Sequence, residues 1–206
     1  MSHTAALLAK YPIISDQITK PALSVLLSQL EAIISKGTHG AAVEFGCYVG
    51  TTSLFMRRLL DVYQDERAFH VYDSFAGLPP KTAQDASVAG DDFQAGELTV
   101  SKKQFIAEFG KARLRTPIIH KQWFDQLCPA DVPDNIAFAF LDGDFYNSIY
   151  DSLKLVWPRM TTGSIVCFDD YGREALPGVK RAIHDYFQGN VPAIQISHNI
   201  GVILKP

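Results

Sequence analysis

Acidic side chains follow two short apolar segments in the second half of the sequence. Asp142 comes directly after residues 136–141, and Asp169 and Asp170 come directly after residues 164–168. If these segments are neighbouring strands of a parallel sheet, their carboxyl ends lie about 4.8 Å apart. Carboxylates that close repel one another unless they are protonated or share a cation, and ligand sets made only of oxygen favour Mg²⁺ or Ca²⁺. We therefore predict that Asp142, Asp169 and Asp170 bind a metal ion, with Mg²⁺ preferred.

A glycine-containing turn with one acidic residue follows the first apolar segment. Glu44, Gly46 and Gly50 are spaced as E-x-G-x-x-x-G, and Thr52 lies where the next helix is expected to begin. Glycine lets the backbone turn tightly and approach a ligand, and the free N–H groups of the helix end face the same place. Tyr48 occupies the second glycine position of the dinucleotide motif G-x-G-x-x-G, which argues against a bound pyrophosphate. The charge of Glu44 suits the cationic end of a ligand, and a helix-entry turn without a ligand is the alternative interpretation.

Two further groups of side chains stand at the ends of predicted strands. Asp73 and Ser74 follow the second apolar segment, and a carboxylate there can accept both hydroxyls of a ribose. Trp123 and Phe124 follow the third segment, where an aromatic ring can stack on the base of a bound nucleoside. The simpler interpretations are a turn cap for Asp73 and core packing for Trp123. With the acidic turn nearby, we favour ribose binding for Asp73.

The elements that must position these residues alternate between strands and helices. Apolar segments are separated by runs with apolar residues at helical spacing. Such alternation implies right-handed crossovers and a mostly parallel sheet with helices on both faces. We predict a single-domain, Rossmann-like α/β fold with a seven-stranded sheet that ends in an antiparallel hairpin. The predicted strands are 41–45, 68–72, 117–120, 136–141 and 164–168, with 193–196 and 201–204 in the hairpin.

Length and composition exclude several classes of protein. The 206 residues suggest one domain, with a helical N-terminal segment over 1–40 and an α/β core over 41–206. A net charge of −3 offers no basic field to nucleic acid. The apolar run 136–141 is far shorter than the roughly 20 residues of a membrane helix. Because we find no signal-peptide pattern and no Cys-x-x-Cys among the three cysteines, we expect a cytoplasmic location.

Residues 76–100 form the longest stretch without a hydrophobic period. Glycine and proline interrupt it at five positions, and long loops of this kind are usually functional lids or disordered segments. We predict that this segment is an active-site lid. We also expect Thr51 or Thr52 to cap the helix after the glycine turn, and Asp144 to cap the helix that follows residues 136–141.

Beyond these single positions, four longer blocks occur together: VEFGCYVGTTSLFM (43–56), VYDSFAGLPP (71–80), FLDGDFYNSIYDSL (140–153) and VCFDDYGREALPGVKRAIHDYF (166–187). A fifth, QWFDQLCP (122–129), falls at the expected place. Together they resemble the macrocin O-methyltransferase family, which methylates sugar hydroxyls in antibiotic biosynthesis. The resemblance covers residues 41–206, and the D-S-F-x-G-L-P block and the D-x-D-x-Y and D-D-Y pair are its most specific parts.

This resemblance implies a class I methyltransferase fold, S-adenosylmethionine as methyl donor and a Mg²⁺ ion. The acceptor would be a small molecule with vicinal oxygens, such as a sugar or a polyphenol. Related enzymes often form dimers, so a homodimer is expected. By position, the resemblance implies cofactor contacts at Glu44, Gly46, Gly50 and Asp73 and metal ligands at Asp142, Asp169 and Asp170; Tyr48, Thr52, Ser74, Trp123 and Phe124 complete the predicted cofactor site.

The resemblance also implies how the reaction proceeds. The metal ion would chelate two adjacent acceptor oxygens and lower the pKa of the hydroxyl, and a general base would take the proton. Members of the family use a histidine as base in the loop after the D-S-F-x-G-L-P block, but residues 76–100 contain none. Asp91 or Asp92 is the predicted replacement, unless the metal bound by Asp142 suffices; Asp142 completes the predicted catalytic set.

Two other functions remain open from the residues. A nicotinamide-dependent oxidoreductase would also place Asp73 after a glycine turn, although Tyr48 argues against it. A non-catalytic protein that binds the cofactor would keep the same fold, and the missing histidine supports that hypothesis.

Overall fold

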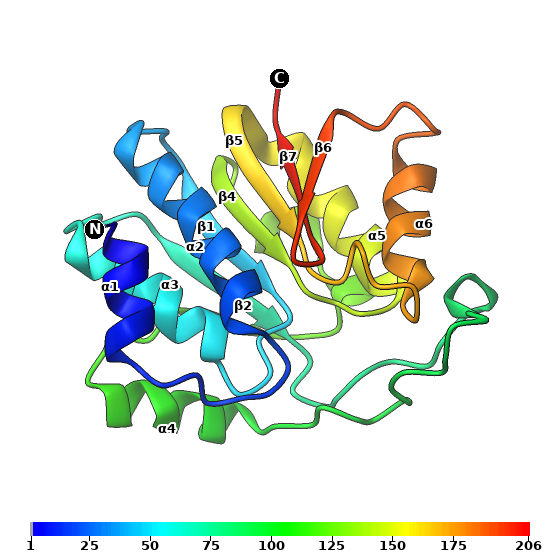
Figure 1. The fold of residues 1–206 in the computed structure, drawn as a ribbon, viewed down its shortest axis with the longest axis horizontal. Helices are drawn as coiled ribbons and strands as arrows, with labels where there is room; N and C mark the ends of the chain where they lie inside the picture. The colour runs from blue at the N-terminus through cyan, green and yellow to red at the C-terminus, as the bar shows by residue number, and fades with distance from the viewer. Residues whose placement is uncertain (1) are drawn as a thin grey trace.

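Seven strands form one sheet in the order β3-β2-β1-β4-β5-β7-β6 in this computed structural model, which describes residues 2–206 (Figure 1). Strands β1 to β5 pair in parallel, whereas β7 runs antiparallel to both β5 and β6. The predicted α/β class and C-terminal hairpin are confirmed; Met1 of the predicted N-terminal segment lies outside the described residues. The strands are β1 (Ala41–Phe45), β2 (Phe69–Asp73), β3 (Ile118–Lys121), β4 (Ile136–Leu141), β5 (Met160–Phe168), β6 (Ile194–Ser197) and β7 (Ile200–Leu204).

Helices cover both faces of the sheet, with α1 to α4 on one side and α5 and α6 on the other (Figure 1). Successive side chains of a strand point to opposite faces. In β4, Phe138 and Phe140 pack against the first group of helices, and Ala139 and Leu141 pack against the second. Because both faces are buried, the strand is one continuous apolar run. The helices are α1 (His3–Lys10), α2 (Lys20–Ser35), α3 (Thr51–Val62), α4 (Lys102–Ala112), α5 (Tyr146–Val156) and α6 (Pro177–Tyr186), with 3₁₀ turns η1 (Ala83–Asp85), η2 (Phe124–Gln126), η3 (Pro129–Asp131) and η4 (Trp157–Arg159).

The predicted cap of α3 is wrong. Gly50 precedes the helix with a φ of 92°, and no side chain caps it. Thr51 and Thr52 are the first residues of the helix, and the hydroxyl of Thr52 donates to Glu44. The Thr52 hydroxyl is therefore directed at a buried carboxylate and accepts no bond from the free N–H groups of the helix end.

The predicted cap of α5 is also wrong. Asp144 makes no capping bond, and Phe145 is the residue before the helix. The amide of Tyr146 instead donates to the carboxylate of Asp85 (2.7 Å), which comes from the segment 76–100. A carboxylate at a helix N-terminus is stabilised by the helix dipole, so this contact joins the segment to α5.

The segment 76–100 runs along the lower edge of the molecule in Figure 1, from β2 towards α6 and back to α4. The Ser87 hydroxyl donates to the carbonyl of Glu174 (2.7 Å). The Arg181 guanidinium donates to the carbonyls of Gln84 and Ala86. These contacts place the segment against α6, and its role as a lid stays a prediction.

None of the helices within residues 2–206 combines the length and apolarity needed to cross a membrane.

Candidate functional site

Main-chain hydrogen bonds fix the relative positions of the residues that follow β1, β4 and β5. The amide of Asp142 donates to the carbonyl of Phe45 (2.8 Å), and the amide of Asp169 donates to the carbonyl of Leu141 (3.0 Å). These two bonds extend the parallel pairing beyond the last paired residues of the strands. Asp142 therefore stands between Gly46 of the glycine turn and Asp169.

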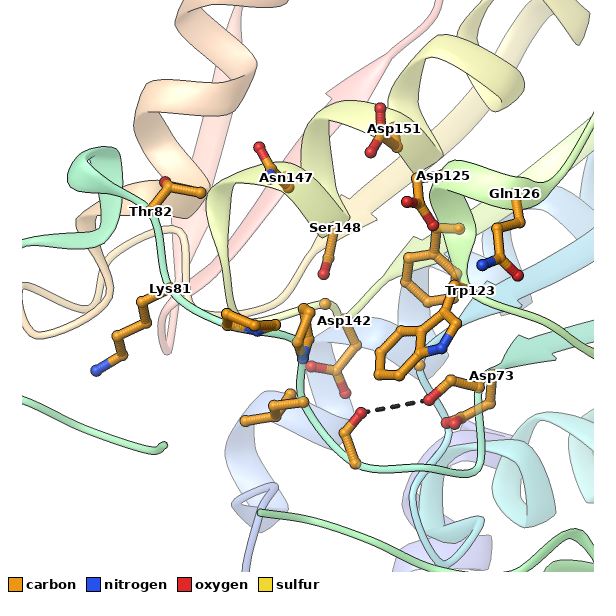
Figure 2. Close-up of a pocket in the computed structure, with 18 residues that line it drawn as sticks. Asp73, Lys81, Thr82, Trp123, Asp125, Gln126, Asp142, Asn147, Ser148 and Asp151 are labelled. Atoms are coloured by element: carbon orange, nitrogen blue, oxygen red, sulfur yellow. Dashed lines mark hydrogen bonds between the residues drawn. The ribbon is translucent and has the colours of Figure 1, made fainter. Parts of the chain in front are cut away.

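A cavity of about 550 Å³, here the main cavity, opens at this edge of the sheet. Its walls come from the glycine turn, the end of β2, the loop after β3, the start of α5 and the segment 76–100. Figure 2 shows side chains of Asp73, Trp123, Asp142 and Ser148 around the middle of this space. Of the predicted site residues, Gly46, Asp73, Ser74, Trp123, Phe124 and Asp142 line it.

The carboxylate of Asp73 is held by backbone donors on both sides. Its Oδ2 accepts from the amides of Cys47 (2.9 Å) and Tyr48 (3.3 Å), and its Oδ1 accepts from the amide of Phe75 (2.7 Å). These bonds tie the end of β2 to the glycine turn. The Cys47 thiol also donates to Oδ2 (3.3 Å), whereas Oδ1 keeps a second lone pair that can accept a further bond. Asp73 can therefore both shape the turn and bind a hydroxyl in the cavity.

Glu44 lies beneath the glycine turn and not in the wall of the main cavity. It is fully buried, and the hydroxyls of Thr52 and Ser53 donate to its carboxylate. Burial raises the pKa of Glu44 to about 7, although these two hydroxyl donors lower it. Gly50 and Thr52 also lie outside the lining of the main cavity. Glu44 can thus act on a ligand through its charge and through the shape of the turn above it.

A smaller cavity of about 70 Å³, here the acidic cavity, adjoins the main cavity. Both cavities share Gly46, Asp73 and Asp142 in their walls. Burial raises the pKa of each carboxyl in the acidic cluster, and the charges of neighbouring carboxylates raise it further. Such a cluster is stable only when it keeps protons or gains a cation. The cluster consists of Asp142, Asp144, Asp169 and Asp170.

Five lining residues of the acidic cavity have a left-handed backbone although they are not glycine. The φ angles are 45° for Tyr48, 61° for Phe93, 56° for Leu98, 58° for Asp144 and 52° for Asp170. Backbone of this kind persists only where the surrounding structure enforces it, and it gathers at functional sites. The strained positions therefore mark the same edge of the sheet as the carboxylates do.

A comparison with known protein families identifies the family of this chain. The profile of the macrocin-O-methyltransferase family (TylF) matches residues 12–200. The chain belongs to the macrocin O-methyltransferase family. The resemblance drawn from the four sequence blocks is thereby confirmed.

Two curated relatives in Streptomyces are O-methyltransferases. The 8-demethyl-8-(2,3-dimethoxy-alpha-L-rhamnosyl)-tetracenomycin-C 4'-O-methyltransferase of Streptomyces olivaceus is 32% identical over 163 residues, which cover 76% of this chain and 61% of that protein. Demethyldecarbamoylnovobiocin O-methyltransferase of Streptomyces niveus is 28% identical over 171 residues, which cover 76% of this chain and 62% of that protein. The macrocin-family chain thus spans less than two thirds of the length of both relatives.

Solved structures confirm the class I methyltransferase fold. The O-methyltransferase NovP superposes with a TM-score of 0.77 at 25% identity, covering 91% of this chain and 81% of that one. The calicheamicin methyltransferase CalS11 superposes with a TM-score of 0.73 at 21% identity, covering 98% of this chain and 89% of that one. The sheet order and the hairpin of this macrocin-family chain are therefore those of the class.

The acidic cluster fits a hard divalent cation by its donor chemistry. Carboxylate oxygens are the ligands that Mg²⁺ prefers, and the negative charge of Asp169 raises the pKa of the buried Asp142. A cation between the carboxylates would relieve this repulsion. Within residues 2–206, however, no three His, Cys, Asp or Glu side chains are already arranged to hold a metal ion. The metal site of this family member stays a prediction.

Asp91 and Asp92, the predicted bases in the segment 76–100, line neither cavity. Asp91 is exposed and pairs with Lys81, whereas Asp92 pairs with Arg173 (2.7 Å). Each carboxylate meets a cavity wall through its ion-pair partner, because Lys81 lines the main cavity and Arg173 lines the acidic cavity. The segment contributes Lys81 and Thr82 to the wall of the main cavity instead.

Several lining residues were not anticipated from the sequence. Asn147, Ser148 and Asp151 line the main cavity from one face of α5, whose opposite face is core. Polar residues at i, i+1 and i+4, on the face opposite the apolar residues of the helix, were a usable signal. Gln17 and Arg173 line the acidic cavity from two loops, and no periodic pattern marks them.

A side chain at Gly46 is expected to destroy the site. The residue has a φ of 87°, and an added Cβ would overlap the main-chain carbonyl of Asp142. We expect Gly46→Ala to lower the melting temperature by roughly 5 °C or more, because both strain and overlap act on it. Thermal unfolding checks this. The matched control is Gly110→Ala within α4, where a Cβ meets nothing within 4 Å, and it is expected to raise the melting temperature slightly. Equal melting temperatures for wild type and Gly46→Ala would count against this view of the turn.

Proposed function

We propose that this chain is an S-adenosylmethionine-dependent O-methyltransferase, assisted by Mg²⁺, whose acceptor is a hydroxyl with a neighbouring oxygen. The family and the fold support the reaction class and the methyl donor. The observation that carries the proposal is the position of Asp142. Its carboxylate lines both cavities, so one side chain faces the space for the cofactor and the acidic cluster together.

The main cavity has the size and the lining for the cofactor. Small-molecule sites usually enclose about 300–1,000 Å³, and this one encloses about 550 Å³. We assign the ribose hydroxyls to Asp73, whose carboxylate is oriented by three amides. We assign the adenine to the half-buried rings of Trp123 and Phe124, which can stack on it. Glu44 acts from beneath the glycine turn, where its negative charge favours the cationic methionine end.

Asp142 is the proposed general base. Asp142 lies where the main cavity meets the acidic cavity, which is within reach of an acceptor hydroxyl held beside the methyl donor. With two carboxylate oxygens, Asp142 can serve the acceptor hydroxyl and the acidic cluster at once. Mg²⁺ held by Asp142, Asp169 and Asp170 would supply Lewis-acid charge that lowers the pKa of the hydroxyl. Enclosure of the donor and acceptor side by side supplies the alignment that methyl transfer needs.

The acceptor class follows from the relatives. Their names state methylation of a rhamnosyl-tetracenomycin, of demethyldecarbamoylnovobiocin and of mycinamicin III. We therefore propose a sugar or a polyphenol-like group of a natural product as the acceptor of this chain. The homodimer and the cytoplasmic location stay predictions.

The direct test is methyl transfer from isotope-labelled S-adenosylmethionine to a panel of rhamnosyl glycosides and catechols, read by mass spectrometry with Mg²⁺ or with EDTA. We expect labelled product from at least one acceptor, and much less of it with EDTA. Equal yields of labelled product with Mg²⁺ and with EDTA would contradict the proposed role of the metal ion. Absence of transfer, together with tight binding of NADH, would favour the oxidoreductase.

A further inference from the structure

Arg173 is the one cation in the lining of the acidic cavity among residues 2–206. It lies in the loop between β5 and α6, and its side chain is 37% exposed. Its Nη2 donates to Asp92 in the segment 76–100 (2.7 Å), while its Nη1 lies 3.6 Å from Asp170 of the acidic cluster. One guanidinium thus stands between the segment and a proposed metal ligand.

The contact of Arg173 with Asp92 is shorter than its contact with Asp170. The contact with Asp92 has the length of a charge-assisted hydrogen bond, whereas the 3.6 Å contact with Asp170 is an ion pair without one. Arg173 partly offsets the negative charge of the cluster, and this attraction lowers the pKa of Asp170 against the effect of burial. The guanidinium therefore acts where a divalent cation would otherwise balance the carboxylates.

We propose that Arg173 is a positioning residue that couples cation binding in the acidic cavity to closure of the segment 76–100. This inference rests on the proposed function, because it assumes that Asp170 helps to bind a divalent cation. A cation at Asp170 repels the guanidinium and cancels its attraction to that carboxylate. Arg173 then pairs fully with Asp92 and holds the segment more firmly across the site.

Removal of Arg173 and removal of the Asp92 charge are expected to change cation binding in opposite directions. Arg173 competes with the cation for Asp170, so its removal strengthens cation binding. Asp92 offers Arg173 an alternative partner, so the loss of the Asp92 charge leaves Arg173 nearer Asp170 and weakens cation binding. Either substitution breaks the Arg173–Asp92 hydrogen bond and therefore releases the segment 76–100 from Arg173. By linkage, a cation that tightens the segment must also bind more strongly when the segment is held.

The experiment measures Mg²⁺ affinity by calorimetry and hydrogen exchange of residues 87–96, both on the full chain without methyl donor or acceptor. For Arg173→Gln we expect Mg²⁺ to bind about fivefold more tightly, since unit charges about 4 Å apart still interact appreciably in water. For Asp92→Asn we expect binding about threefold weaker, by the same reasoning. Mg²⁺ should slow exchange of the segment in wild type and in neither variant.

Controls separate this coupling from a general effect of charge. Arg115→Gln breaks an exposed ion pair with Glu66 (3.1 Å), remote in sequence from the site, and should change neither readout. Arg173→Lys keeps the charge and should restore near-wild-type Mg²⁺ affinity. Equal Mg²⁺ affinities in wild type, Arg173→Gln and Asp92→Asn, or a change of the same sign in both variants, would overturn the inference. Lack of Mg²⁺ binding by wild type and by Arg173→Gln would instead overturn the metal part of the proposed function.

Discussion

Replacing Asp142 by Asn is expected to lower kcat for methyl transfer by about 100-fold or more, the usual range for loss of a general acid or base. The Asn side chain keeps the size of Asp but cannot take a proton. The same variant should be more stable than wild type at pH 8 and closer to it at pH 5. Burial raises the pKa of Asp142 in the folded state, so the stability associated with its neutral form is lost as pH rises. Steady-state kinetics and melting curves at both pH values check the two effects.

Asp151→Asn is the matched control for this variant. Asp151 lines the same cavity from α5 and pairs with Lys154 (2.8 Å), outside the acidic cluster. We expect its kcat to stay within about threefold of wild type, because Asp151 does not line the acidic cavity and has no proposed role in proton transfer. A kcat loss in Asp151→Asn as large as that in Asp142→Asn would contradict the assignment of the base.

Replacing Glu44 by Gln is expected to weaken S-adenosylhomocysteine binding by about tenfold and yet stabilise the unliganded protein at pH 8. The weaker binding follows because the charge beneath the glycine turn is lost; one tenfold step equals about 1.4 kcal/mol. The pKa of Glu44 is about 7 against an ordinary value of 4.5. The stability that the neutral Glu44 carboxyl contributes to the folded state is therefore present in full below pH 4.5. It is lost as the pH rises through 7, by roughly 3 kcal/mol in total.

The neutral Gln removes this pH dependence. At pH 5 the melting temperatures of wild type and Glu44→Gln should be similar, and at pH 8 that of the variant should be several degrees higher. Calorimetry with S-adenosylhomocysteine checks the affinity, which in wild type should increase between pH 6 and pH 8 because the bound ammonium favours the ionised carboxyl. If Glu44→Gln bound the ligand as tightly as wild type at pH 8, Glu44 would be only a structural residue.

The strands could be predicted because their residues are buried on both faces. Residues 41–45 and 136–141 have the predicted bounds, and each is a run of buried side chains with turn residues after it. β5 begins at Met160 instead of Ser164, because the polar and glycine residues at its start give no apolar signal. The residues that follow the strands were found by the same argument, since a parallel sheet gathers them at one edge.

The contacts of the segment 76–100 could not be predicted from the sequence. Asp85 reaches Tyr146 across 61 positions, and Asp92 reaches Arg173 across 81. Such pairs depend on how the chain returns to the sheet and leave no local period. The same limit explains why Asp144 was expected to cap α5, where Asp85 from the segment 76–100 accepts the bond. The cap of α3 failed for a local reason, because the Thr52 hydroxyl donates to the buried Glu44.

The measurement that tests the central claim most directly is a fluorescence titration of the Trp157→Phe variant with S-adenosylhomocysteine. The chain has two tryptophans, and Trp157 packs against Phe187 and Lys205, so this variant reports on Trp123 alone. If the main cavity binds the cofactor, the emission of Trp123 should change with saturation at micromolar ligand, and NADH should leave it unchanged. No response to S-adenosylhomocysteine, with a saturable response to NADH, would contradict the assignment of this chain as a methyltransferase.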